Sequence, residues 1–198
     1  MSERLRIPGP RDVRATLDGP ADADTLVVAC PPHPQMGGSR TDSRLTAVAD
    51  ALADRGTACL RFDYGPWDDG HGEVRDAVAA CEWGRERYDR LGLFGYSFGG
   101  GVALLAALET DPFAVSVLAP HAAVGERDAT PAVADLDCPL QVIYGERDDS
   151  AEWENIVETA REHGATVESM AADHFFVGQR ARAAEAVASW LTGRLRSR

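Results

Sequence analysis

A serine between two glycines is the first feature of this sequence that could do chemistry. Residues 95–99 read Gly-Tyr-Ser-Phe-Gly and lie between a short apolar run, residues 91–94, and a longer one, residues 102–108. A Gly-x-Ser-x-Gly pattern in this setting is typical of a sharp strand-to-helix turn, in which the serine is strained and its hydroxyl is exposed. Ser97 is therefore the candidate nucleophile of an acyl-transfer reaction.

A serine hydroxyl needs a general base, and the base needs a third group to orient it. In the α/β type of serine hydrolase, the acid and then the histidine follow the serine along the chain. Asp148 lies directly after a predicted strand, with Asp149 and Glu146 beside it as alternatives. His174 follows the last predicted strand, and catalytic groups collect at the carboxyl ends of such strands. We therefore predict a triad of Ser97, Asp148 and His174.

The tetrahedral intermediate of acyl transfer needs two N–H donors at its oxygen. One donor is predicted to be the backbone N–H of Phe98, the residue after the nucleophile. The second is expected in the loop at residues 31–38, which reads Pro-Pro-His-Pro-Gln-Met-Gly-Gly. Its prolines are excluded because they have no N–H. His33 and Gln35 remain as the leading donors, with Met36 as a weaker third.

The elements that would position these residues follow a repeated pattern of strand and helix. Short β-rich runs alternate with longer amphipathic runs, which favours an α/β fold with a mostly parallel twisted sheet of about seven strands and helices on both faces. The length of 198 residues fits one domain over residues 1–198. The predicted strands are residues 13–17, 25–30, 57–62, 91–95, 114–118, 140–144 and 166–170, and the predicted helices are residues 43–55, 73–88, 98–110, 151–163 and 179–195.

The net negative charge of the chain limits the classes of partner that it can bind. There are 32 acidic residues against 20 basic ones, all of them arginine, for a formal charge of −12. We therefore expect no binding to nucleic acid or anionic membranes, and a small molecule as the partner of a monomer or small homo-oligomer. A lysine-free acidic composition is similar to that of proteins from salt-loving archaea, so we predict a halophilic protein. With no long apolar segment and no apolar leader, we expect a cytoplasmic location.

The remaining cysteines and histidines suggest no cofactor or metal. The cysteines are scattered, without metal-ligand spacing, and are interpreted as reduced core residues. They are Cys30, Cys59, Cys81 and Cys138. His71 belongs to an acidic, glycine-rich segment that is interpreted as a solvated turn rather than a metal site. His121 and His163 have no supporting context, and we expect solvated structural roles for both.

Six short motifs occur in an order typical of one family. They are residues 32–38, 61–64, 70–73, 95–99, 145–148 and 173–176. On these motifs the sequence resembles the small, lidless α/β-hydrolases described as dienelactone-hydrolase-like, from about residue 25 to residue 191. The sequence differs from the family at Pro31, where the family has a histidine, and in a shorter loop after Tyr64.

The resemblance implies an α/β-hydrolase fold without a large cap domain, because only about 20 residues separate the two strands between which caps are commonly inserted. It also implies a carboxylesterase-like or dienelactone-hydrolase-like serine hydrolase for small esters or thioesters. Met36, Trp67 and Phe175, together with Phe98, could form an apolar acyl site. The alternative is a non-catalytic protein of the same fold that binds a ligand or partner.

Overall fold

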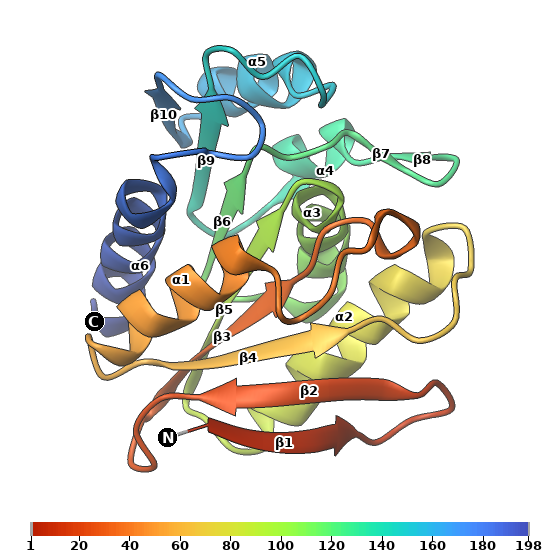
Figure 1. The fold of residues 1–198 in the computed structure, drawn as a ribbon, viewed down its shortest axis with the longest axis vertical. Helices are drawn as coiled ribbons and strands as arrows, with labels where there is room; N and C mark the ends of the chain where they lie inside the picture. Colours follow the sequence, from red (N-terminus) through yellow and green to blue (C-terminus); the bar gives the residue numbers. More distant parts are fainter. Residues whose placement is uncertain (1, 198) are drawn as a thin grey trace.

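The computed structural model describes residues 2–197, and its centre is a twisted eight-stranded sheet with the order β1-β2-β4-β3-β5-β6-β9-β10 (Figure 1). Neighbouring strands from β4 to β10 run parallel, whereas β1 and β2 run antiparallel to their neighbours. The mostly parallel sheet predicted from the sequence is thus confirmed. The strands are β1 (Ser2–Ile7), β2 (Val13–Asp18), β3 (Thr25–Cys30), β4 (Ala58–Asp63), β5 (Arg90–Tyr96), β6 (Ala114–Leu118), β9 (Leu140–Gly145) and β10 (Thr166–Met170).

The prediction of about seven strands missed β1, which extends the sheet at its edge. This strand reads Ser-Glu-Arg-Leu-Arg-Ile, and only Ile7 is buried. It pairs along its whole length with β2, from Ser2 opposite Asp18 to Ile7 opposite Val13. A charged edge strand of this kind carries little apolar signal, because one neighbour and solvent surround it. Its charged side chains also protect the sheet edge from pairing with other chains.

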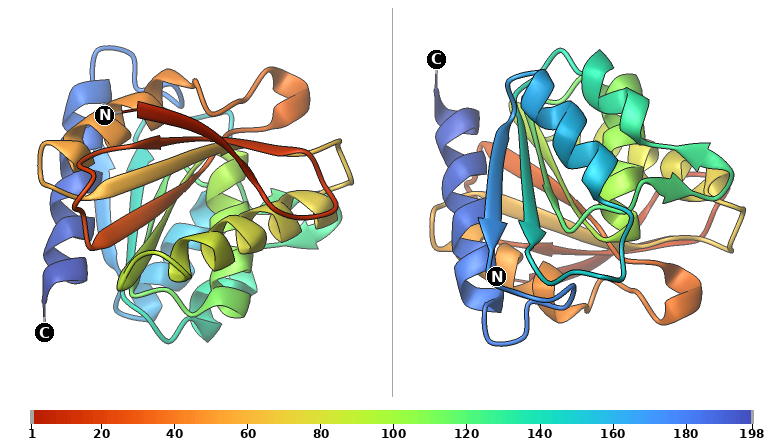
Figure 2. Two further views of the ribbon diagram at one scale, coloured as in Figure 1. Left: turned by 90° about the horizontal axis from the view of Figure 1, so that it is seen from below. Right: turned by 90° about the horizontal axis from the view of Figure 1, so that it is seen from above.

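Helices cover both faces of the sheet (Figure 2). One face carries α1 (Ser43–Ala53) and α6 (Arg180–Arg196), and the other carries α2 (His71–Arg85), α3 (Phe98–Thr110), α4 (Thr130–Asp135) and α5 (Glu154–Glu162). The two layers require strands that are buried on both faces. In β3, Val27 and Val28 are both fully buried but belong to opposite cores, because side chains alternate along a strand.

The segment between β6 and β9 adds no cap domain over the sheet. It forms a small hairpin of β7 (Ala123–Val124) and β8 (Arg127–Asp128), followed by the short helix α4. Neither element was predicted, since two-residue strands and a single six-residue helix are too short to show a hydrophobic period. The absence of a large cap among residues 2–197, expected from the spacing, is confirmed.

The predicted functional residues lie at one edge of the sheet, after the carboxyl ends of parallel strands. The loop at residues 31–38 follows β3, Ser97 follows β5, Asp148 follows β9 and His174 follows β10. Since the carboxyl ends of parallel strands meet at the same edge, these residues converge there. Among the helices of residues 2–197, none has the length and apolarity needed to cross a membrane.

Candidate active site

Ser97 occupies a strained turn between β5 and α3. Its backbone has φ 57° and ψ −125°, a region that residues with side chains seldom adopt. Glycines on both sides make the turn possible. A Cβ on Gly95 would lie 2.1 Å from the carbonyl oxygen of Gly99, and a Cβ on Gly99 would lie 2.2 Å from that of Cys30. The sharp turn predicted from Gly-x-Ser-x-Gly is therefore present, and the close approach of β3 to the turn explains the need for glycine.

The side chains of Ser97, His174 and Asp148 form a continuous hydrogen-bonded chain. Ser97 Oγ lies 3.0 Å from His174 Nε2, and His174 Nδ1 lies 2.8 Å from Asp148 Oδ2. The other carboxylate oxygen, Oδ1, accepts the backbone N–H groups of Ser150 at 3.0 Å and Ala151 at 3.2 Å. A carboxylate at Nδ1 keeps the proton on that nitrogen, which leaves Nε2 able to accept a proton from the serine.

The alternative acids of the same loop do not contact His174. Asp149 is exposed, and its side chain accepts only a long hydrogen bond from Ser150 Oγ, at 3.4 Å. Glu146 is also exposed and accepts a hydrogen bond from Ser169 Oγ at 2.8 Å. Within the described residues, Asp148 is the acidic side chain of this loop that meets the imidazole.

Tyr96 supports the histidine loop from the strand that leads to Ser97. Its hydroxyl donates to the backbone carbonyl of His174 at 3.1 Å, and its ring centroid lies 5.6 Å from that of the imidazole. Burial raises the pKa of the Tyr96 phenol, so the hydroxyl stays protonated and keeps its donor role. The guanidinium of Arg44 lies over the Tyr96 ring, with its Cζ 4.6 Å from the ring centroid. Sequence analysis did not identify either residue.

In the loop after β3, most backbone N–H groups donate hydrogen bonds to acceptors within the loop itself. The N–H of Gln35 donates to His33 Nδ1 at 3.2 Å, and the N–H of Met36 donates to the His33 carbonyl at 3.0 Å. By contrast, the backbone N–H groups of His33 and Phe98 have no acceptor among residues 2–197. Gly38 closes the loop, because a Cβ there would lie 2.2 Å from the carbonyl oxygen of Pro32.

A cavity of about 640 Å³ opens beside Ser97. Met36 and Phe175 lie at its mouth with exposed fractions of 85% and 54%. Trp67 does not line the cavity but packs against the His33 ring at a tilt of 33°, with 4.7 Å between centroids. The lining residues are Pro32, His33, Met36, Gly37, Gly38, Asp42, Arg44, Tyr96, Ser97, Phe98, His121, Ala123, Ser150, His174 and Phe175.

His121 lies in this cavity wall, a position that the sequence analysis did not predict for it. Its backbone N–H donates to the carbonyl oxygen of Ser97 at 3.1 Å, which ties the end of β6 to the turn. No local motif surrounds His121 in the sequence, and only the pairing of β5 with β6 brings it to the site. The position directly after a parallel strand is the one signal that could have identified it.

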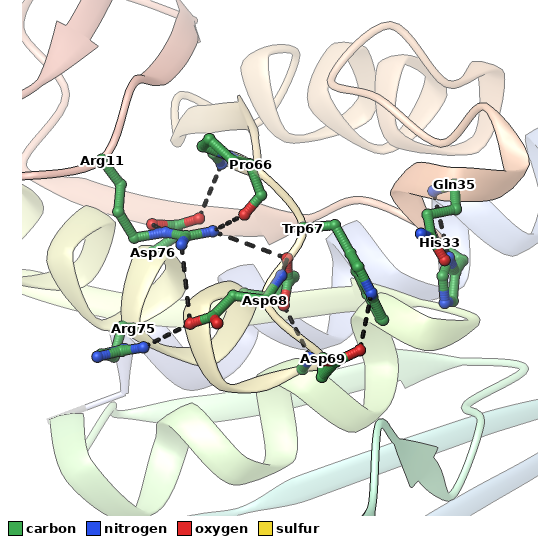
Figure 3. Close-up of polar contacts among 12 residues, drawn as sticks. Arg11, His33, Gln35, Pro66, Trp67, Asp68, Asp69, Arg75 and Asp76 are labelled. Atoms are coloured by element: carbon green, nitrogen blue, oxygen red, sulfur yellow. Dashed lines mark hydrogen bonds and ion pairs between the residues drawn. The ribbon is translucent and has the colours of Figure 1, made fainter.

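The short loop after Tyr64 is held by a buried ionic network (Figure 3). The Arg11 guanidinium donates to Asp76 at 2.7 Å and to the carbonyl of Pro66, and Asp76 accepts the N–H of Gly65 at 2.8 Å. Glu73, fully buried at the start of α2, accepts the N–H groups at positions 68 and 70 and lies 3.7 Å from Arg11. The network fixes Trp67, whose ring Figure 3 shows between Arg11 and His33.

Pro31, one of the two departures from the resembled family, lies in a loop that is anchored to the residue after β4. The hydroxyl of Tyr64 donates to the carbonyl of Pro31 at 3.1 Å.

His71, in the acidic, glycine-rich segment considered above, is the first residue of α2. In the described part of the chain, no group of three or more His, Cys, Asp or Glu side chains is placed to hold a metal ion.

Comparison with known proteins gives both a family and related structures. The family model of the dienelactone hydrolase family matches residues 61–191. No curated protein matches the sequence. Among solved structures, the chain is similar to a lidless α/β serine hydrolase from Xanthomonas campestris, with 27% identity, a TM-score of 0.85, and coverage of 100% of this chain and 96% of that one.

Two further structures share the fold at lower identity. A dienelactone hydrolase from Anabaena variabilis is 21% identical with a TM-score of 0.82, and 99% of each chain is covered. An α/β serine hydrolase homologue from Coxiella burnetii is 24% identical with a TM-score of 0.84, with 96% of this chain and 97% of that chain covered. Together with the sheet order, these similarities establish the α/β-hydrolase fold.

Proposed function

The chain belongs to the dienelactone hydrolase family and is an ester-acting hydrolase, and from this premise we propose that it cleaves small acyl esters or thioesters through an acyl-enzyme on Ser97. The observation that carries the proposal is the chain of hydrogen bonds from Ser97 through His174 to Asp148. The strained turn at Ser97 and the two unpaired backbone N–H groups beside it support the same chemistry.

The proposed reaction has two halves. His174 Nε2 takes the proton of Ser97 Oγ as the oxygen attacks the ester carbonyl, and it then gives that proton to the leaving alcohol or thiol. In the second half a water molecule gives a proton to His174, attacks the acyl-enzyme and releases the acid, and the proton returns to Ser97. Asp148 holds the imidazole in the required tautomer and stabilises its positive charge in both halves.

The proposed oxyanion hole consists of the backbone N–H groups of Phe98 and His33. His33 is chosen over Gln35 and Met36 because the N–H groups of those two residues already donate to the side chain and carbonyl of His33. A donor that is unpaired before the reaction costs nothing to redirect when negative charge develops on the substrate oxygen.

We also propose that Met36 and Phe175 contact the acyl or alcohol part of the substrate, since both are apolar and lie at the cavity mouth. Trp67 acts indirectly, by supporting the ring of His33. The partner is a small molecule, and the protein is a monomer or small homo-oligomer. A cytoplasmic location and adaptation to salt are proposed from the sequence composition alone.

A fluorophosphonate probe tests the proposal, because it labels only an activated serine. Wild type and Ser97→Ala are compared for labelling and for hydrolysis of p-nitrophenyl acetate and butyrate, at both low and molar salt. Loss of labelling and turnover in Ser97→Ala is the expected result. A folded wild type that resists the probe at every salt concentration would instead support a non-catalytic, ligand-binding protein.

A further inference from the structure

Two histidine rings on the wall of the cavity have no part in the proposed acyl transfer. His33 lies in the loop after β3, and His121 follows β6. These two strands flank β5, which ends at Tyr96 just before Ser97, so the sheet order brings both residues to the turn that carries the nucleophile. The two side chains are therefore placed to contact the same substrate.

The backbone holds both rings in the same tautomer. His33 Nδ1 accepts the N–H of Gln35 at 3.2 Å, which Figure 3 shows, and His121 Nδ1 accepts the N–H of Ala123 at 3.3 Å. A ring nitrogen that accepts a hydrogen bond carries no proton, so the neutral ring carries its proton on Nε2. Each ring thus offers an Nε2–H donor, and neither donor has an acceptor in residues 2–197.

Further contacts position both residues before a substrate binds. His33 is packed against Trp67 and Phe98, with 4.7 Å and 4.6 Å between ring centroids. The backbone N–H of His121 is bonded to Ser97. Burial lowers the pKa of His33; the negative charge of Glu73 raises it, and the nearby His121 lowers it. The net lowering keeps the ring of His33 neutral and therefore able to accept from Gln35.

The charged pair in the cavity leaves this part of the wall without net charge. The guanidinium of Arg44 donates to the carboxylate of Asp42 at 2.5 Å, so the positive charge is already neutralised. Two N–H donors beside a neutralised pair, in a protein with a formal charge of −12, suit an uncharged oxygen acceptor better than an anion.

We infer that the imidazole rings of His33 and His121 form a donor subsite for a second carbonyl oxygen of the substrate, distinct from the ester carbonyl. A carbonyl oxygen has two lone pairs and can accept from both rings, whereas an alkyl chain would leave both donors unpaired. The subsite selects esters of keto acids over alkyl esters of equal length. The inference rests on the proposed esterase function, because it defines the substrate class of that same cavity.

Hydrolysis of two esters of equal chain length tests the subsite. We expect kcat/KM for p-nitrophenyl 4-oxopentanoate to exceed that for p-nitrophenyl pentanoate by about 5- to 10-fold, the effect of one or two net hydrogen bonds. His121→Asn should lower this ratio clearly, because the Asn oxygen can accept from Ala123 but no donor remains at the Nε2 position, and only the donor of His33 is left. His121→Gln, which restores a donor there, should recover part of the ratio.

The matched control is His163→Asn. His163 is an exposed residue after α5 whose Nδ1 lies 2.9 Å from the carbonyl of Thr159, and it does not line the cavity. This variant should keep the wild-type ratio. Equal kcat/KM for the two esters in wild type, or an unchanged ratio in His121→Asn, would overturn the subsite and leave the proposed function intact.

Two further measurements separate the remaining outcomes. A preference for mono-p-nitrophenyl glutarate over the keto ester would overturn the assignment of an uncharged acceptor. If neither ester is hydrolysed, the proposed function fails, and binding to Ser97→Ala decides the inference. Methyl 4-oxopentanoate, but not methyl pentanoate, should shift the ¹⁵N ring signals of His33 and His121, which should report Nε2–H tautomers; Nδ1–H tautomers or unshifted signals would contradict the inference.

Discussion

The carboxylate of Asp148 and the imidazole of His174 meet at 2.8 Å, and the Asp148 side chain has no exposed surface. One carboxylate oxygen is occupied by two backbone N–H groups of its own loop, which directs the other oxygen to Nδ1 of His174. The backbone hydrogen bonds hold the carboxylate in one rotamer, so it is already oriented to bind the imidazole. The neighbouring Asp149 is exposed and makes no such contact.

Replacing Asp148 should therefore impair catalysis much more than stability. We expect Asp148→Asn to lower kcat by about 10³- to 10⁴-fold, because the amide can stabilise the wrong imidazole tautomer. Asp149→Asn is the matched control and should keep nearly full activity. Steady-state kinetics with p-nitrophenyl butyrate measures both, and a near-normal kcat for Asp148→Asn would remove the orienting role from this residue.

Gly99, the glycine next to the proposed oxyanion donor Phe98, should tolerate no side chain. In Gly99→Ala, the new Cβ would lie 2.2 Å from the carbonyl oxygen of Cys30, at the end of β3, and 2.4 Å from that of Pro31, in the loop that carries His33. We expect either a drop of more than about 100-fold in kcat with a folded protein, consistent with loss of an oxyanion donor, or a protein that does not fold.

Gly193→Ala provides the matched control for that substitution. Gly193 is exposed within α6, and a Cβ there would meet no atom within 4 Å. We expect unchanged activity and a gain of about 0.5 to 1 kcal/mol in the free energy of unfolding, because alanine favours a helix interior over glycine. Urea denaturation followed by circular dichroism measures the gain. Wild-type activity in Gly99→Ala would contradict the need for close contact between the two loops.

The buried carboxylate of Glu73 should stabilise the loop that supports Trp67. Glu73→Ala removes the acceptor of two backbone N–H groups and a partner of Arg11. We expect a loss of about 3 kcal/mol in the free energy of unfolding, the usual consequence of breaking a buried ionic contact. Glu82→Ala changes an exposed residue of the same helix and should change stability by less than about 0.5 kcal/mol. Equal stabilities of the two variants would argue against the network.

The four cysteines should be unreactive in the folded protein. Cys30, Cys59 and Cys81 are buried, and Cys138 is partly exposed. Burial raises the pKa of Cys138 to about 11, with the nearby Asp111 adding to the rise. At pH 8 about one thousandth of this thiol is then in the reactive thiolate form. Iodoacetamide at pH 8, followed by mass spectrometry, should modify none of them rapidly, and all four after unfolding in urea. Fast modification of native Cys138 would refute the raised pKa.

Salt should stabilise the protein. With a formal charge of −12, the folded chain repels itself, and raising the ionic strength from about 0.1 M to about 1 M shortens the screening length from about 10 Å to about 3 Å. We expect the Tm to rise with NaCl over this range, measured by differential scanning fluorimetry. A Tm that is constant or that falls would contradict the halophilic interpretation of the lysine-free composition.

The local pattern of the sequence was sufficient for most of the fold. The predicted helix at residues 98–110 coincides with α3, because the strained serine and Asp111, whose φ of 42° ends the helix, are both local features. All seven predicted strands are present. Five of them are buried nearly throughout, and strands buried on both faces appear as largely apolar runs; these are β3, β4, β5, β6 and β9. The edge strand β1 and the short helix α4 were missed because neither carries such a run.

For the candidate site, the sequence alone was enough to predict the turn at Ser97, the loop that would hold the acid and the loop that would hold the base. These depend on short-range backbone geometry and on the order of strands and helices. Three features required the three-dimensional structure: which carboxylate meets His174, which N–H of the loop after β3 stays unpaired among residues 2–197, and that His121 lines the cavity. Those outcomes depend on the register of β3, β6, β9 and β10 around β5, which joins residues far apart in the chain and leaves no local trace in the sequence.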